Sequence, residues 1–246
     1  MNEPLHWLTL LLSGPNPSRW PVIRAALSLG LQKDELLTVL VAPSEESEAR
    51  SELADQRFRI VLWTMEDGKI RFSEALVEGE ANLLLYSGNP FPDELIEAIA
   101  KESQSGVFEI SRVITQVHCG WCKESREAKA WFDACIHFSD LVLLDNRGDV
   151  EDAWVRDFQE HYRKEHYPCY FDLVKKGVPK HPEWIFDSQP RRLSLIFDPD
   201  DLSGMDLAGY EIEGDEPEEE EELTGDPYLR RNAAGERERK VRPLPS

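Results

Sequence analysis

The sequence has little positive charge and no long apolar run. Its 246 residues include 28 Lys and Arg against 48 Asp and Glu, which gives a net charge of −20. Nucleic acids and anionic membranes bind proteins through clustered Lys and Arg, so neither is expected as a partner. No apolar run approaches the length of a membrane span, and Leu8–Leu12 is a block the size of one β-strand.

Two further absences concern the cellular compartment. Four cysteines in a chain of this length do not indicate a disulfide scaffold. A secretory signal peptide needs a positive start and a small-residue cleavage site after a long apolar stretch, but Glu3 stands at the start and no such site follows. Seven tryptophans and 41% hydrophobic residues favour a packed core. The sequence therefore predicts a cytoplasmic globular protein.

Charge separates the C-terminal part of the chain from the rest. Between Leu193 and Leu229 there are 14 acidic residues and no Lys or Arg, and the segment that follows is rich in arginine. Like charges with few large apolar side chains do not repay the entropy of ordering. We therefore predict one domain over residues 1–202 and a disordered tail, acidic and then basic, over residues 203–246. The tail could be a solubilising extension, a partner-docking arm or a segment that folds back on itself.

Short apolar segments alternate with amphipathic ones along the body of the chain. This alternation predicts an α/β fold with a mainly parallel sheet covered by helices on both faces. Strands are expected at Leu8–Leu12, Leu36–Val41, Phe58–Trp63, Asn82–Tyr86, Val107–Val117, Leu141–Leu144, Tyr170–Val174 and Leu193–Phe197. Helices are expected at Pro21–Leu31, Glu45–Ala54, Asp93–Glu102, Lys123–Phe138 and Val150–His166.

Ligands of such sheets bind beyond the carboxyl ends of the strands, so the loops there are the candidate sites. The most informative loop is Asn146-Arg147-Gly148-Asp149, which directly follows an apolar strand. It has the form Asn-(Lys/Arg)-x-Asp, by which many P-loop GTPases read guanine. The aspartate accepts hydrogen bonds from guanine N1 and N2, and the cationic side chain packs on the ring. An ordinary strand-ending turn has similar residues.

The order of landmarks along the chain resembles the CobW-type (CobW, HypB and UreG) family of P-loop GTPases and metallochaperones. The matching blocks, within residues 5–180, are Leu10-Leu11-Leu12-Ser13-Gly14, Tyr86-Ser87-Gly88-Asn89-Pro90, Val113-Ile114-Thr115-Gln116-Val117 and Phe138-Ser139-Asp140 leading to Asn146. The resemblance implies a P-loop NTPase-like fold that takes GTP or GDP. It also implies a vestigial nucleotide site, with Asn146, Arg147 and Asp149 at guanine. Gly14 belongs to the first loop, where Arg19 would stand in for a phosphate contact and Ser18 for a magnesium ligand, although neither falls in the Gly-Lys-Thr pattern of the family.

The phosphate loop departs from the family's pattern. A working loop needs several glycines, a lysine and a Ser or Thr for magnesium. Between Ser13 and Trp20 there is one glycine, and Pro15 and Pro17 have no N–H to donate. The family's Cys-x-Cys-Cys motif and C-terminal domain have no counterpart here. We therefore expect a non-catalytic protein that acts through protein partners, in metal or cofactor handling; a residual guanine-nucleotide binder is the alternative.

A second candidate site is the turn His118-Cys119-Gly120-Trp121-Cys122. A Cys-x-x-Cys at a helix start lowers the pKa of the first thiol, and the same spacing binds soft metals. Cys119 and Cys122 with His118 as third ligand would form an open zinc site suited to metal transfer. Redox chemistry and purely structural thiols are the alternatives, and Trp121 is interpreted as a packing residue.

Overall fold

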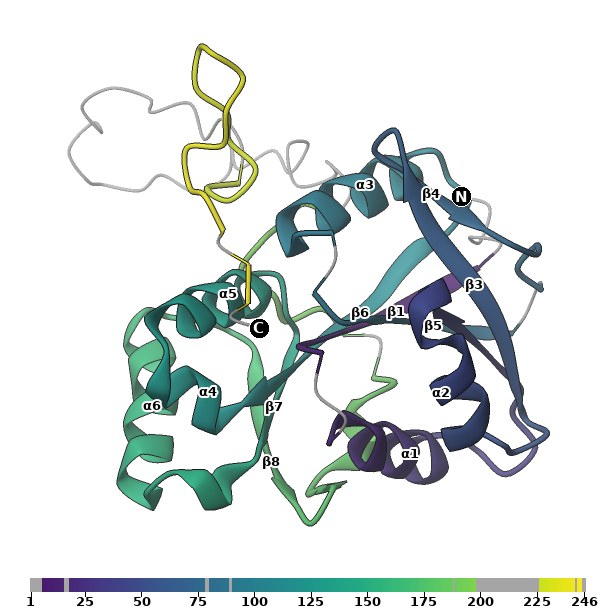
Figure 1. Cartoon of the computed structure of the whole chain (residues 1–246), viewed down its shortest axis with the longest axis horizontal. Coiled ribbons are helices and arrows are strands. Elements are labelled where there is room, and N and C mark those ends of the chain that lie inside the picture. Colours follow the sequence, from purple (N-terminus) through teal and green to yellow (C-terminus); the bar gives the residue numbers. More distant parts are fainter. Residues whose placement is uncertain are drawn as a thin grey trace, which may run out of the picture.

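The computed structural model describes residues 6–15, 18–77, 80–88, 90–187, 189–197, 226–241 and 243–244. These residues form a nine-stranded sheet with helices on both faces, so the chain is an α/β protein as predicted (Figure 1). The strands are β1 (Trp7–Ser13), β2 (Leu37–Val41), β3 (Phe58–Glu66), β4 (Lys69–Phe72), β5 (Ala81–Tyr86), β6 (Glu109–His118), β7 (Leu141–Asp145), β8 (Tyr170–Lys175) and β9 (Val178–Pro179). The helices are α1 (Arg19–Gly30), α2 (Glu46–Glu52), α3 (Pro92–Gln104), α4 (Cys119–Glu124), α5 (Arg126–His137) and α6 (Asp152–Lys164), with 3-10 turns η1 (Pro43–Glu45), η2 (Arg147–Asp149) and η3 (Pro182–Trp184).

The strand order is β4-β3-β2-β5-β1-β6-β7-β8-β9. The central strand, β1, is parallel to β5 and to β6, and its Leu10 lies opposite Leu84 and Val113. Parallel pairing continues outward to β3 and β8, and in the described part of the chain only the edge strands β4 and β9 are antiparallel. The four strands expected at Leu8–Leu12, Asn82–Tyr86, Val107–Val117 and Leu141–Leu144 therefore share one parallel sheet, and that prediction is confirmed.

Alternating side chains of the strands build a core on each face of the sheet. Leu8, Leu10 and Leu12 of β1 pack in one cluster with residues of α3, α5 and α6, whereas Leu11 faces the opposite cluster with residues of α1 and α2. The two helical layers are visible on either side of the sheet in Figure 1. This double coverage explains why the strands are nearly continuous apolar runs. No helix among the described residues is both long and apolar enough to cross a membrane.

Several expected elements differ from the structure. Residues 193–197 form no strand. The helix expected at Lys123–Phe138 is two helices, α4 and α5, because the extended backbone of Ser125 separates them and its hydroxyl caps α5 by accepting from Ala128 N–H at 3.1 Å. The antiparallel edge strands β4 and β9 were not expected. Each follows a turn with two left-handed residues, Asp67-Gly68 and Lys176-Gly177.

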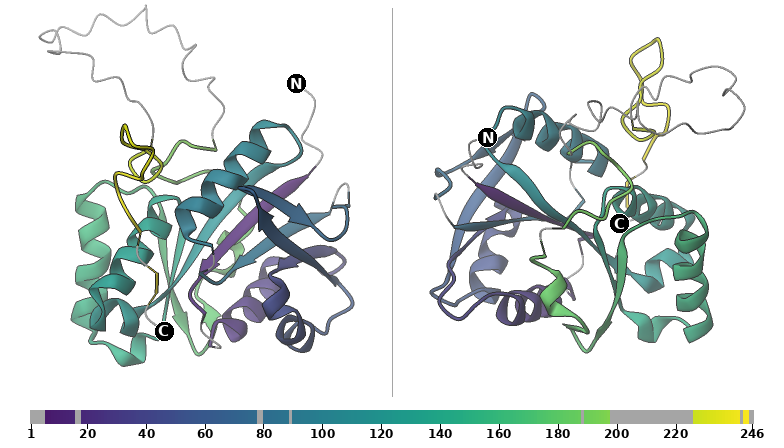
Figure 2. Two further views of the ribbon diagram at one scale, coloured as in Figure 1. Left: turned by 45° about the horizontal axis from the view of Figure 1, so that its top comes forward. Right: turned by 180° about the vertical axis from the view of Figure 1, so that it is seen from behind.

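The C-terminal region also differs from its prediction. Residues 226–241 and 243–244, here called the C-terminal strap, lie on the side of the sheet that carries α3 and α5 (Figure 2). Tyr228 is buried, and Arg237 forms ion pairs with Asp93 and Glu97 of α3. The prediction of a disordered tail is therefore wrong for the strap. The prediction for residues 203–225, and the domain boundary at residue 202, lie outside the described residues.

Candidate functional site

Three neighbouring strands bring the predicted site residues to one edge of the sheet. β1, β6 and β7 lie side by side and are parallel, so the loops after them meet beyond their carboxyl ends. Two hydrogen bonds tie this edge together: Ser18 Oγ donates to Asn146 Oδ1 at 3.1 Å, and Gln116 Nε2 donates to Asp145 Oδ2 at 3.0 Å. The predicted residues that line cavities here are Gly14, Ser18, Arg19, His118, Asn146 and Arg147.

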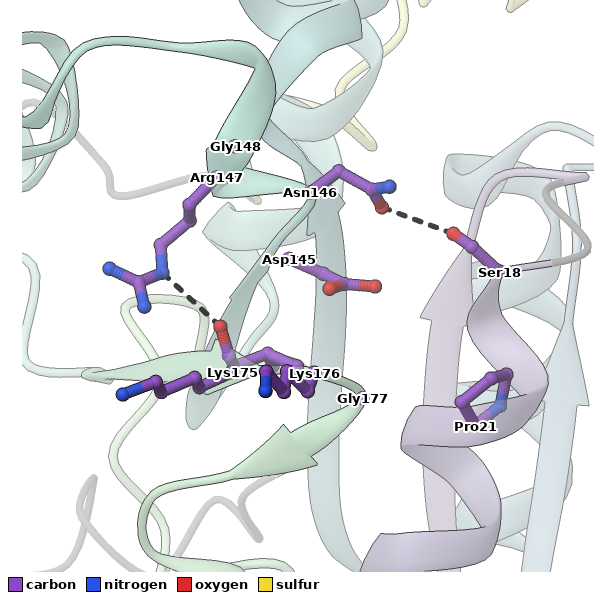
Figure 3. Close-up of a pocket in the computed structure, with 10 residues that line it drawn as sticks. Ser18, Pro21, Asp145, Asn146, Arg147, Gly148, Lys175, Lys176 and Gly177 are labelled. Atoms are coloured by element: carbon purple, nitrogen blue, oxygen red, sulfur yellow. Dashed lines mark hydrogen bonds between the residues drawn. The ribbon is translucent and has the colours of Figure 1, made fainter.

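A pocket of about 420 Å³ opens beside the end of β7 (Figure 3). It is enclosed by the start of α1, the η2 turn and the turn between β8 and β9. Its lining residues are Ser18, Pro21, Asp145, Asn146, Arg147, Gly148, Val174, Lys175, Lys176 and Gly177. The volume lies within the usual range for small-molecule sites. Because the lining combines a carboxylate, an amide and cationic side chains, the pocket suits a polar ligand.

Asn146 and Arg147 are positioned by an unusual backbone. Asn146 has φ 52° and ψ 38°, a left-handed conformation that asparagine tolerates better than most residues. Its side chain reaches toward α1, where it accepts from Ser18. Arg147 points toward the β8–β9 turn, and its Nε donates to the carbonyl oxygen of Val174 at 3.2 Å. These two residues of the guanine motif therefore flank the pocket from opposite sides.

Asp149, the third residue of that motif, is placed elsewhere. It is exposed and is not among the residues that line the pocket. A Cβ added to Gly120 would lie 3.1 Å from Asp149 Cβ and 3.2 Å from its Oδ2, so this carboxylate faces the start of α4. The structure therefore does not bring Asp149 to the lining of this pocket with Asn146 and Arg147. Asp145 is the carboxylate that lines the pocket instead.

Arg19 is engaged within the fold. Its side chain is 3% exposed, forms an ion pair with Glu45 of η1, and donates to Ser13 Oγ at 3.4 Å. The guanidinium carbon also lies 4.8 Å from the centre of the Trp20 ring. The carboxylate of Glu45, whose side chain is 11% exposed, offsets the positive charge of this guanidinium. Arg19 thus forms an ion pair within the fold and also lines the small cavity beside Gly14, and its role as a phosphate contact stays a prediction.

Gly14 lies under two large side chains. A Cβ placed on Gly14 would be 2.6 Å from Cζ3 of Trp121 and 3.1 Å from Cδ1 of Leu244. The cavity that Gly14 and Trp121 line with His118 and Asn146 is about 10 Å³, which is room for one water molecule at most. Trp121 and Leu244, the last residue of the strap, therefore leave no room for a side chain at this position.

His118 and Trp121 stabilise one another. Their rings stack with centroids 4.5 Å apart. His118 Nδ1 also accepts a hydrogen bond from the backbone N–H of Trp121 at 3.4 Å, and this bond caps the start of α4. Burial lowers the pKa of His118 below its ordinary value of 6.5, although Asp149 and Asp145 oppose this shift. The imidazole is therefore neutral near pH 7, with Nδ1 as an acceptor. The packing role expected for Trp121 agrees with this geometry.

The cysteines of this turn are buried thiols. Burial raises the pKa of Cys119 to about 12 and the pKa of Cys122 well above its ordinary value. α4 has only six residues, so its dipole does little against burial. In the described part of the chain, no three His, Cys, Asp or Glu side chains are placed to hold a metal ion together. The structure therefore does not group His118, Cys119 and Cys122 as three metal ligands, and the zinc site stays a prediction.

Sequence reasoning missed several residues that shape this edge. Asp145 is the last residue of β7. A carboxylate at the end of a buried parallel strand indicates a ligand-binding position, so the sequence could have predicted it. Lys176 and Gly177 lie in the β8–β9 turn and both have positive φ. The glycine after an apolar strand is a sequence signal for such a turn. Glu45 and Leu244 are far from their partners in sequence, and no local pattern marks them.

The fold and the site together define a class of protein. The chain is an α/β protein with a mainly parallel sheet, and a pocket that includes charged and amide side chains in its lining lies beside the carboxyl end of β7. Comparisons with protein-family models, curated proteins and solved structures found no match for this chain. The function is therefore inferred from the chemistry of the site.

Proposed function

We propose that this chain is a degenerate, non-catalytic relative of the CobW-type P-loop GTPases, which acts in the cytoplasm through contacts with protein partners in metal or cofactor handling. The observation that carries the proposal is the position of Trp121, whose ring closes the space above Gly14. The bond between Ser18 and Asn146 supports the ancestry, because it joins the first loop to the guanine motif. The parallel sheet with β1 at its centre is compatible with the same fold.

Phosphoryl transfer depends on positioned positive charge and on backbone amides around the phosphates. Arg19 is paired with Glu45, and Pro15 has no N–H to offer. Catalysis needs room for the phosphates, a free positive charge beside them and backbone amide donors around them, and we infer that all three are compromised here. A protein that loses these features and keeps its fold also keeps the surfaces by which it binds other proteins. Binding to protein partners is therefore the function that we propose.

GTP turnover tests this proposal. Release of inorganic phosphate from GTP with magnesium should proceed at the rate of buffer alone, both for the wild type and for Asn146→Ala. Magnesium-dependent turnover by the wild type that Asn146→Ala abolishes would refute a non-catalytic role. Asn146→Ala is a suitable comparison because Asn146 touches both the pocket and the β1–α1 loop.

The pocket beside β7 favours a second candidate, residual recognition of a guanine base without its phosphates. Asn146 and Arg147 flank a cavity of about 420 Å³, and Asp145 provides a carboxylate that can accept from ring N–H groups. The test is calorimetry with guanosine, which has no phosphate. Binding of guanosine in preference to adenosine, weakened by Arg147→Ala, would support this candidate, and no heat with either nucleoside would exclude it.

A further inference from the structure

The C-terminal strap is held to the body by side chains and not by the sheet. In the described part of the chain, its one β-bridge is internal and joins Arg231 to Arg237. It contacts three places in turn: the end of α5, the acidic face of α3, and the loops after β1 and β5. This is how a bound peptide contacts a groove, with pockets for separate side chains along its length.

The first contact is at the end of α5. His137 Nε2 and Asp226 Oδ2 are 2.7 Å apart, and both side chains are almost fully buried. Burial raises the pKa of Asp226, but hydrogen bonds from His137 and Ser194 outweigh it and leave the pKa below its ordinary value. The ring of Tyr228 lies 4.9 Å from the ring of His137 and 5.9 Å from that of Phe138. An aromatic slot with a neighbouring imidazole thus receives the start of the strap.

The second contact is electrostatic. Arg237 Nε lies 3.1 Å from Asp93 Oδ2, and a second nitrogen of the same guanidinium pairs with Glu97. Arg231 reaches the same Glu97 carboxylate at 2.8 Å. Hydrogen bonds and charges from Lys101, Arg237 and Arg231 outweigh burial and lower the pKa of Glu97. Two carboxylates on one face of α3 therefore select arginine side chains.

The third contact is apolar. Leu244 Cδ1 lies 3.1 Å from the Cβ position of Gly14 and 3.7 Å from that of Gly88. Both glycines follow parallel strands, β1 and β5, so the absence of a Cβ at each leaves a hollow for one aliphatic side chain. The Trp121 ring borders the same hollow over Gly14.

The connection between strap and body is long. Residues 198–225, which are 28 residues outside the described part of the chain, separate Phe197 from Asp226. Both ends of this connection are anchored near His137, because Ser194 N–H donates to the His137 carbonyl oxygen and Asp226 pairs with its ring. Because the strap is held to the body by side-chain contacts, an external peptide that offers the same side chains competes with it for the same surface.

We propose that the surface beneath the strap, formed by His137, Phe138, Asp93, Glu97, Gly14 and Gly88, is a docking groove for a basic peptide segment of a partner protein. The peptide presents an aromatic residue to the α5 slot, arginines to α3 and an aliphatic residue to the glycine hollow. The strap is the occupant that the chain itself provides, and a partner binds by displacing it. This inference rests on the proposed role in protein contacts and supplies the chemistry of the partner.

Fluorescence anisotropy with a labelled peptide of residues 226–246 tests the groove. The full chain is titrated as wild type, as Arg237→Glu and as Lys240→Glu. Arg237→Glu breaks the contact with α3, whereas Lys240→Glu is the same charge reversal at a residue paired with Glu236 inside the strap. Because the groove of the wild type is mostly occupied, Arg237→Glu should bind the peptide about tenfold more tightly than the other two proteins.

A second variant removes ambiguity about folding and charge. Tyr228→Ala weakens the contact of the strap with the α5 slot without changing any charge or any groove residue, so it should also bind the peptide more tightly than the wild type. Equal peptide affinity of Arg237→Glu, Lys240→Glu and the wild type would overturn the proposal. Dimers of Arg237→Glu that form with rising concentration would also overturn it, because a second copy would then be the occupant. Neither result bears on GTP turnover, so the proposed loss of catalysis is judged separately.

Discussion

The Trp121 ring lies directly above Gly14, so close that a Cβ at this position would be 2.6 Å from Cζ3 of the indole. Trp121 belongs to the short helix after β6, and Gly14 belongs to the loop after β1, which pairs with β6. Two neighbouring parallel strands thus place a large side chain and a glycine against each other at the ligand-binding edge. The contact accounts for both the need for glycine at position 14 and the closure of the space above it.

Replacing Gly14 by alanine should strain this contact. The added methyl group collides with Trp121 and presses on Leu244, and such overpacking costs about 1–3 kcal/mol. Urea denaturation of Gly14→Ala measures the loss, and Gly14→Ala with Trp121→Leu should recover part of it, since a smaller side chain leaves room for the methyl group.

The matched control is Gly148→Ala. A Cβ at Gly148 meets no atom within 4 Å, so this change should alter the free energy of unfolding little. If Gly14→Ala were as mild as Gly148→Ala, the indole would not be packed over Gly14 as described.

Arg19→Met should destabilise the fold strongly. It leaves Glu45 without its cation at a site where both side chains are nearly buried, and a lone buried charge costs about 3–5 kcal/mol. The double change Arg19→Met with Glu45→Leu should restore much of this loss, because it removes both charges. Thermal unfolding of the three proteins measures the coupling.

Arg24→Met serves as the comparison for Arg19→Met. Arg24 pairs with Glu52 at the surface, where its side chain is 48% exposed, and exposed pairs are worth less than about 1 kcal/mol. Similar small effects at both arginines would mean that Arg19 is not a structural ion-pair residue.

The core of the fold follows from the sequence because its signals are local. Runs such as Leu8–Leu12 and Leu141–Leu144 are apolar at every position, and only a strand covered on both faces needs that pattern. The division between α4 and α5 depends on one capping serine, Ser125, inside an otherwise helical stretch. The β3–β4 hairpin was missed although Asp67-Gly68 is a strong turn signal.

The candidate site was predictable only in part. Asn146 and Arg147 follow their strand directly, so their place at the edge was fixed by β7. The rotation of the η2 turn carries Asp149 to Gly120 and away from the pocket, which no tetrapeptide pattern reveals. The docking of the strap depends on pairs such as Arg237 with Asp93, which are 144 residues apart in sequence.

Acid should weaken the fold through His118. Its folded pKa lies below its ordinary value of 6.5 because burial disfavours the charged ring. Between the folded and unfolded pKa values the unfolded chain binds more protons, so the free energy of unfolding falls as the pH drops below about 6.5. His118→Asn keeps a side-chain acceptor for the α4 cap and does not titrate. Urea denaturation from pH 8 to pH 5 should show a smaller pH-dependent loss for His118→Asn than for the wild type, and parallel curves would contradict this.

The thiols of α4 should react slowly in the folded protein. Burial raises the pKa of Cys119 to about 12, so almost no thiolate exists at pH 8. Ellman's reagent should therefore titrate Cys119 and Cys122 only after urea is added, and Cys119→Ser with Cys122→Ser should lower the urea count by two thiols. Rapid reaction of two thiols in the native wild type, absent from the double variant, would reveal an accessible redox or metal site instead.

The proposal that the chain has lost its phosphate site is tested most directly by isothermal titration calorimetry of the wild-type chain with GDP and magnesium. We predict no binding heat, because Trp121 and Leu244 fill the space above Gly14 and Arg19 is held by Glu45. A saturable, magnesium-dependent binding curve that Asn146→Ala abolishes would contradict the closure of this site.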